Sequence, residues 1–261
     1  MGFGDAIMAT GLARGFRKRG IRAAFGDGVK IKWDKHCGPI FQGNPNVAPP
    51  GAENAKDLEW IAHYKGKRAY NSAGPDRWIW NYDFRAVPGE LFFDMRERAV
   101  VSRQGSGFAI IEPNVPRWKS VAPNKDWGTR NYQYVADRLK DKGIKVAQFL
   151  YGGSEQLSGV RQIATSSIRD ALAILSNAII YVGPEGGLHH GAAALGVRGV
   201  VIFGGFIPPA VTGYDIHTNL TGGADACGMF KFCEHCRAAL ARITPDEVFE
   251  AAVMQMKGKP V

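Results

Sequence analysis

The clearest hydrophobic pattern lies between residues 178 and 205, where apolar, glycine-rich, small-residue and apolar stretches follow one another. Residues 178–182 are apolar and rich in β-forming side chains, which predicts a parallel strand buried on both faces. Residues 183–187 predict a turn, residues 188–195 a helix and residues 200–203 a second strand. The turn of such a βαβ unit lies at the carboxyl end of a strand, where free N–H groups and the helix dipole favour a phosphate.

The same alternation of strands and helices appears in both halves of the chain. In the first half, residues 6–19 have apolar positions on one helical face, and residues 21–25 read as a strand. In the second half, residues 108–114 and 144–150 are predicted to be strands. Residues 131–142 and 167–175 are predicted to be helices. We therefore predict an α/β protein with two Rossmann-like domains that face each other across a ligand cleft.

A linker-like stretch separates the two halves. Residues 104–107 are Gln-Gly-Ser-Gly, and a buried strand begins directly after them. We place the domain boundary there, with residues 1–105 in the first domain and residues 106–261 in the second.

The segment from residue 52 to residue 103 has no regular period but holds a cluster of aromatic side chains. Such a cluster could stack on a base or a sugar, but we favour the simpler interpretation of a core packed with large side chains. Its members are Trp60, Tyr64, Tyr70, Trp78, Trp80, Tyr82 and Phe84.

Composition adds one constraint, which is positive charge. The 261 residues are 45% hydrophobic and 22% charged, as in an ordinary globular protein, and carry a formal charge of +9. This charge favours an anionic partner: a nucleotide diphosphate, an anionic glycolipid, a membrane surface or nucleic acid. No stretch approaches the ~18 apolar residues of a transmembrane helix, and the opening is unlike a signal peptide. We expect a cytoplasmic protein, and action at the inner face of the membrane is one option for it.

Three of the four cysteines, Cys227, Cys233 and Cys236, are closely spaced. This spacing suits a structural zinc or iron site, or simply reduced and partly buried thiols. A structural zinc site needs four ligands. The candidates for the fourth are His235, His217 and Cys37.

Three motifs resemble glycosyltransferase family 9, the heptosyltransferase-like group, whose members have two facing Rossmann-like domains in the GT-B arrangement. Residues 2–10 (GFGDAIMAT) look like the family's amino-terminal glycine-rich loop with its aspartate. Residues 183–196 (GPEGGLHHGAAALG) look like its donor-binding segment. The cysteine cluster followed by residues 243–248 looks like the helix that closes many members.

Two departures from the family pattern change the expectation. Members normally have a β-strand before the glycine-rich loop, whereas only Met1 stands there, so we expect the first domain to be reduced. Glu185 stands in place of the usual aspartate and Gly186 in place of a threonine, which removes one hydroxyl donor to a phosphate.

The resemblance implies inverting, metal-independent transfer from a nucleotide sugar, most simply an ADP-sugar. It makes Asp5 the candidate base, although a carboxylate at a helix start is also a cap. Gly2 and Gly4 would form the glycine-rich loop, and His189 is expected to be a surface group. The predicted donor-binding residues are Lys125, Glu185, Gly186, Gly187, Leu188 and His190.

We therefore predict a glycosyltransferase that moves heptose or another sugar to an acceptor hydroxyl, with a lipopolysaccharide-core sugar as the first acceptor to consider. Three alternatives stay open. The positive charge also allows a phage-type enzyme that glycosylates a DNA base. The altered donor loop allows a nucleotide-binding module without turnover, and the two-domain architecture allows a nucleotide-sugar epimerase.

Overall fold

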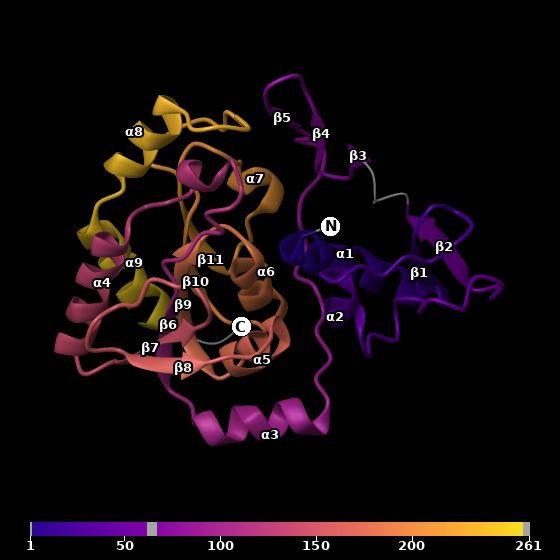
Figure 1. Cartoon of the computed structure of the whole chain (residues 1–261), viewed down its shortest axis with the longest axis horizontal. Helices are drawn as coiled ribbons and strands as arrows, with labels where there is room; N and C mark the ends of the chain where they lie inside the picture. The colour runs from indigo at the N-terminus through magenta and orange to yellow at the C-terminus, as the bar shows by residue number, and fades with distance from the viewer. Residues whose placement is uncertain (1, 62–66, 258–261) are drawn as a thin grey trace.

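The computed structural model describes residues 2–61 and 67–257. Met1, Tyr64 and the last four residues of the predicted second domain lie outside these ranges. The chain forms two units that lie side by side, a smaller N-terminal one and a larger one built on a six-stranded sheet (Figure 1).

The larger unit is a parallel sheet with the strand order β11-β10-β9-β6-β7-β8. Its strands are β6 (Phe108–Ile111), β7 (Lys145–Leu150), β8 (Arg161–Ala164), β9 (Ala178–Pro184), β10 (Gly199–Ile202) and β11 (His217–Leu220). The chain moves outward from β6 through β7 to β8 and then returns to β9 beside β6. This is the doubly wound order, and the place where it reverses, between β6 and β9, is where such sheets bind ligands.

Helices cover both faces of this sheet. The core on one side holds residues of α5 (Ile168–Leu175) and α6 (Gly187–Ala194). The core on the other side holds residues of α4 (Thr129–Asp141), α8 (Glu234–Arg242) and α9 (Pro245–Lys257). Two short helices, η2 (Ala122–Asn124) and α7 (Pro209–Thr212), lie in the connections. The predicted α/β class and the predicted elements of this half are confirmed.

The structure corrects one feature of the predicted turn. Gly183 and Pro184 belong to β9 and pair with Val201 and Ile202 of β10, so the turn shortens to Glu185 and Gly186. The glycine is needed for packing, because a Cβ on Gly183 would lie 2.3 Å from the hydroxyl of Tyr181.

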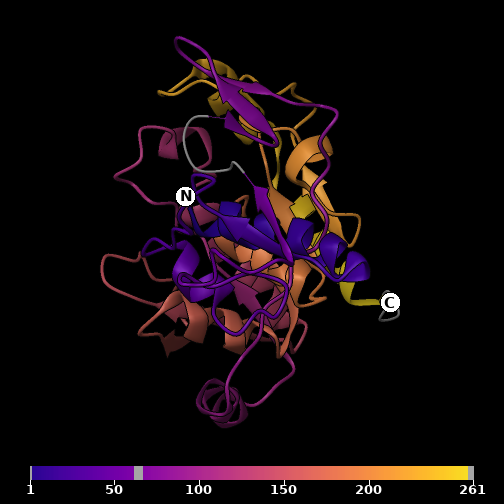
Figure 2. The ribbon, with the colours of Figure 1, turned by 90° about the vertical axis from the view of Figure 1, so that its right-hand side faces the viewer.

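The smaller unit contains α1 (Phe3–Phe16), η1 (Arg17–Arg19), β1 (Arg22–Phe25), α2 (Cys37–Phe41) and β2 (Leu58–Ile61). β1 and β2 form a parallel pair. Figure 2 shows these elements overlying the larger unit, and α1 packs on α6.

Two elements of the irregular segment were not predicted. A three-stranded antiparallel sheet consists of β3 (Lys67–Arg68), β4 (Asn71–Ala73) and β5 (Trp78–Trp80). Helix α3 (Met95–Gln104) then leads to β6 and packs on α5, so the predicted boundary at residues 105/106 falls directly after it. No helix within residues 2–61 and 67–257 is both long and apolar enough to cross a membrane.

A buried ion pair ties the two units together near α3. The guanidinium of Arg169 on α5 contacts Glu97 on α3 and donates to the carbonyl oxygens of Pro39 (2.5 Å) and Phe92 (2.6 Å). Both charged side chains are buried, so the pair fixes where the smaller unit sits.

Candidate active site

A cleft of about 1170 Å³ runs between the two units. The smaller unit lines it with the start of α1 and with the β3–β5 sheet, and the larger unit with the carboxyl ends of β6 and β9. The cleft therefore lies at the switch point of the sheet, where a doubly wound fold holds its ligand.

The first polar group in the cleft is a buried cluster at the end of β9. The carboxylate of Glu185 contacts the ammonium of Lys125, and its other oxygen lies 3.3 Å from Nε2 of His190. Burial alone would raise the pKa of Glu185, but the neighbouring Lys125 and His190 outweigh it and hold that pKa below its usual range. Tyr214 fixes the far side of the His190 ring, with its hydroxyl 2.8 Å from Nδ1. The structure thus brings together three of the predicted donor residues.

The N-terminus of α6 opens onto the same place. Gly186 is its N-cap, Gly187 and Leu188 begin it, and all three line the cleft. The first N–H groups of a helix have no partner within the helix, and the helix dipole is positive there. A Cβ on Gly186 would meet nothing within 4 Å, so the position that lacks the family's threonine is open.

The second polar group surrounds Asp5, across the cleft in α1. One oxygen of Asp5 accepts from the hydroxyl of Tyr70, and the other accepts from the backbone N–H of Gly2 at 2.7 Å. Nη2 of Arg68 lies 3.4 Å from Asp5, and its Nη1 donates to the Tyr70 hydroxyl at 3.0 Å. Asp5 therefore caps its helix and also points into the cleft. Burial and the Asp5 charge raise the pKa of Tyr70 well above its usual value, so Tyr70 stays a donor.

Gly4 lies in the first turn of α1 rather than in the loop that the sequence predicted, since the helix begins at Phe3. The reason is the crossing of α1 and α6, because a Cβ on Gly4 would lie 2.7 Å from Cδ2 of His190. Both helix N-termini thereby reach the cleft.

We expect Gly4→Ala to lower the free energy of unfolding by about 1–3 kcal/mol, because the added methyl group overpacks the crossing. Gly15→Ala in the same helix is the matched control, since its Cβ would meet nothing within 4 Å, and it should stabilise by about 0.5–1 kcal/mol. Chemical denaturation measures both. Equal effects of the two substitutions would contradict the close crossing.

Glu112 is a further carboxyl group at the cleft, directly after β6, that the sequence did not single out. Its Oε1 accepts from Nδ2 of Asn114 at 2.6 Å, whereas its buried Oε2 has no hydrogen-bond partner among residues 2–61 and 67–257. Burial raises the pKa of Glu112 to about 7.

This raised pKa makes a prediction for Glu112→Gln. Between the unfolded pKa of 4.5 and the folded pKa of about 7, the folded wild type binds more protons, so this carboxyl group costs stability as the pH rises. Removing it should raise the stability of the variant relative to the wild type by about 1.4 kcal/mol for each pH unit in that window. Urea denaturation from pH 4.5 to 7.5 measures the difference, and a constant difference would contradict the raised pKa.

His189 is buried, which corrects the expected surface position. Neither ring nitrogen has a hydrogen-bond partner within the described residues, and burial holds the pKa of His189 well below its usual value. Its ring packs between those of Phe203 and Tyr214, at 5.4 and 5.2 Å. The neutral imidazole therefore supports the wall behind the α6 N-terminus.

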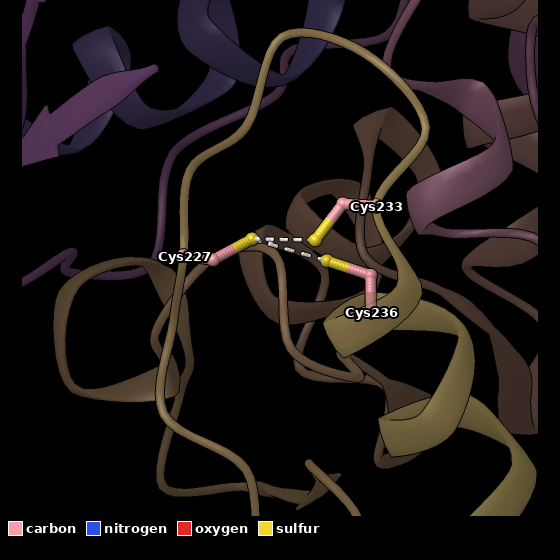
Figure 3. A group of neighbouring side chains, drawn as sticks. All are labelled: Cys227, Cys233 and Cys236. Atoms are coloured by element: carbon pink, nitrogen blue, oxygen red, sulfur yellow. Dashed lines mark hydrogen bonds between the residues drawn. The ribbon is translucent and has the colours of Figure 1, made fainter. Parts of the chain in front are cut away.

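The sulfur atoms of Cys227, Cys233 and Cys236 point at one another between the loop after β11 and the start of α8 (Figure 3). Sγ of Cys227 lies 3.7 Å from that of Cys233 and 3.2 Å from that of Cys236. Sulfur ligands of a tetrahedral Zn²⁺ lie about 3.8 Å apart, given metal–sulfur bonds of about 2.3 Å. The three thiols thus fit a thiophilic metal ion.

None of the predicted fourth ligands joins this group. The three sulfur atoms lie within 4.8 Å of one another, and that group includes no other side chain from the described part of the chain. Nε2 of His235 lies 2.7 Å from the carbonyl oxygen of Asp225. The ring of His217 packs against that of His189, and Cys37 lies in α2. The spacing of the three cysteines is therefore matched by their clustering, whereas His235, His217 and Cys37 lie outside the group.

Arg68 and Tyr70 are the cleft residues that the sequence reasoning missed as polar groups. Tyr70 was noted only as one of several aromatic residues, and no motif marks Arg68. Their contact with Asp5 depends on the fold of the β3–β5 sheet, and the sequence carries no signal for it.

The comparisons with known proteins agree with this geometry. Residues 108–228 match the family model described as glycosyltransferase family 9 (heptosyltransferase). A comparison with curated proteins gives no match.

Among solved structures, the fold is similar to a family 9 glycosyl transferase from Veillonella parvula, with a TM-score of 0.65 at 13% identity over 98% of this chain and 95% of that one. It is also similar to TibC, a dodecameric iron-containing glycosyltransferase from enterotoxigenic E. coli (TM-score 0.62, 12% identity, 98% and 74% covered). E. coli ADP-heptose LPS heptosyltransferase II aligns over 70% of this chain, with 20% identity and a TM-score of 0.46, and the match spans 55% of that enzyme.

The matched residues 108–228 include Lys125, Glu185 and His190. The resemblance noted in the sequence is therefore supported by two findings: residues 108–228 match the model of glycosyltransferase family 9, and the fold is similar to that of a solved family 9 glycosyl transferase.

Proposed function

We propose that this protein is a glycosyltransferase that moves a sugar from a nucleoside diphosphate to an acceptor hydroxyl in the cleft between the units. The observation that carries the proposal is the meeting of two groups in one cleft. The buried Lys125–Glu185–His190 cluster stands at the α6 N-terminus, and Asp5 faces the cleft from α1.

The donor-side residues suit a diphosphate. Lys125 supplies a full positive charge. The N–H groups of Gly186, Gly187 and Leu188 supply hydrogen-bond donors at the partly positive end of the helix dipole. Glu185 is ionised and has an oxygen for a sugar hydroxyl, while His190 is oriented by Tyr214. Gly2 begins the opposing helix, so a bound diphosphate would lie between two helix N-termini.

The proposed reaction is a single displacement with inversion at the anomeric carbon. The acceptor hydroxyl loses its proton to the Asp5 carboxylate as the new carbon–oxygen bond forms. The bond from the anomeric carbon to the diphosphate breaks, and its electron pair leaves on the diphosphate. Lys125 and the helix N-termini stabilise that leaving charge, so these residues supply the function that a divalent metal would otherwise perform.

For the substrates, we propose an ADP-sugar, with ADP-heptose tested first, because the matched family is described as heptosyltransferase. We propose an anionic glycolipid as the acceptor because the chain carries a charge of +9, and DNA is the competing acceptor on the same ground.

We also propose that the three clustered thiols bind one zinc or iron ion. The support is their mutual spacing, together with the fold similarity to TibC, which is an iron-containing protein. The ion would lie outside the reaction path proposed above.

Mass spectrometry of products tests the proposed function. Purified protein is incubated with ADP-, UDP-, GDP- and TDP-sugars, with and without a lipopolysaccharide-core acceptor or duplex DNA. Sugar addition to one acceptor with release of the nucleoside diphosphate supports transfer and names both substrates. Isomerised donor without acceptor would establish an epimerase instead. Binding without any turnover would establish a nucleotide-binding module.

A further inference from the structure

The three-thiol cluster is connected to the β3–β5 sheet of the other unit. Cys227 is followed by Gly228, whose carbonyl accepts from the backbone N–H of Trp78 at 2.9 Å. Two residues on, Phe230 donates its N–H to the carbonyl of Asp76 at 3.0 Å. The loop between β11 and α8 thereby pairs with the turn before β5, and Arg77 forms an antiparallel bridge with Met229.

The loop packs tightly against the strand at this contact, so neither segment can shift without a steric clash. Gly228 has a φ of +67°, and a Cβ there would lie 2.3 Å from the carbonyl oxygen of Trp78. The ring of Phe230 packs edge-on against that of Trp78 at 5.0 Å. The loop is also fixed from behind, because Nδ2 of the buried Asn124 donates to the carbonyls of Met229 (3.1 Å) and Lys231 (2.7 Å).

Trp78 contacts Arg68, which in turn contacts Asp5. The guanidinium of Arg68 lies over the Trp78 ring, 5.4 Å from its centroid. The same guanidinium lies 3.4 Å from Asp5 and donates to the hydroxyl of Tyr70, which itself donates to Asp5. Two contacts therefore separate the loop that carries Cys227 from the residues that hold Asp5.

We propose that the thiol cluster acts as a metal-dependent clasp, meaning a contact that holds the two units together when a metal ion is bound. The ion would be held by Cys227, Cys233 and Cys236 and would fix the loop of residues 221–233. This loop would in turn fix Trp78, Arg68 and Tyr70 around Asp5. The ion that the thiols select is a thiophilic one, Zn²⁺ or Fe²⁺. Trp78 and Arg68 are positioning residues in this account. The expected effect of the metal on catalysis rests on the proposed function, in which Asp5 is the base. The metal-dependent contact between the units does not depend on that function.

Hydrogen exchange tests the clasp without any reaction. The reduced protein is stripped with a chelator and then loaded with Zn²⁺ alone. We expect one Zn²⁺ per chain and about 10-fold slower exchange in peptides that contain the amides of Trp78 and Phe230. Cys233→Ser, at a half-buried thiol, should lose both responses, while Cys37→Ser, outside the cluster, should keep them. Zinc binding without slower exchange at Trp78, or a Cys227–Cys236 disulfide in place of bound metal, would overturn the proposal.

Kinetics then tests the consequence at Asp5. Removing Zn²⁺ should lower kcat about 10-fold, change donor affinity less than about 2-fold and shift the acid limb of the kcat–pH profile, because the groups around Asp5 move. Loss through general unfolding would weaken donor binding equally and would contradict the positioning role. If the loaded protein transfers no sugar, the proposed function fails, whereas the exchange result still decides the clasp.

Discussion

Replacing Asp5 by asparagine lowers kcat by a factor of about 10²–10⁴ if Asp5 is the base, which is the usual contribution of a positioned acid–base group. The asparagine side chain keeps one oxygen for the N–H of Gly2, so the helix cap survives, and its amide nitrogen can donate to the hydroxyl of Tyr70 in place of the second carboxylate oxygen. The amide cannot take up the acceptor's proton. Steady-state kinetics with the identified donor and acceptor measures the loss, and donor affinity should stay within about 3-fold.

Asp83→Asn is the matched control for this prediction. Asp83 is exposed on the same unit and lies outside the residues that line the cleft, so its replacement should leave kcat unchanged. An Asp5→Asn protein with kcat within a factor of about three of the wild type would show that Asp5 is only a helix cap.

Replacing Lys125 by methionine has the second large effect, because it acts on stability and on donor binding together. Glu185 is almost fully buried and would keep only His190 as a partner for its charge. Stranding one member of a buried ion pair costs about 3–5 kcal/mol of unfolding free energy. Loss of the positive charge at the diphosphate should also lower kcat/KM by a factor of about 10²–10³.

A second substitution separates the two effects of Lys125→Met. Adding Glu185→Gln removes the stranded charge, so denaturation should show recovery of most of the stability, while kcat/KM should stay low. Lys142→Met, at an exposed position of the larger unit, is the control and should change neither quantity. Recovery of kcat/KM in the double variant would contradict a direct role of Lys125 in donor binding.

The sequence predicts the larger unit well because its central strands are buried on both faces. Residues 108–111 and 178–184 pair with strands on both sides, so they need continuous apolar runs, and the glycine-rich turn between β9 and α6 follows directly. The edge strands β8 and β11 escaped prediction, because RQIA and HTNL are half exposed and carry polar side chains.

The candidate site divides in the same way. Glu185 and His190 could be named because they stand in the motif after a buried strand, and Lys125 because of the resemblance to family 9. Arg68 and Tyr70 could not. Arg68 lies on the two-residue strand β3 and Tyr70 in the turn before the three-residue strand β4, and this small sheet contacts the loop before α8. His189 was misplaced because nothing in the sequence indicates that both adjacent histidines of this short helix are buried.

The most direct test of the donor site is a thermal-shift titration of the purified protein with ADP, UDP, GDP and TDP and their sugar conjugates. A ligand that binds only the folded state raises Tm, by linkage. We predict that one nucleotide family, with ADP as the first expectation, raises Tm, and that Glu185→Ala weakens the shift given by its sugar conjugate. No shift from any nucleotide or nucleotide sugar at millimolar concentration would contradict a donor site at the α6 N-terminus.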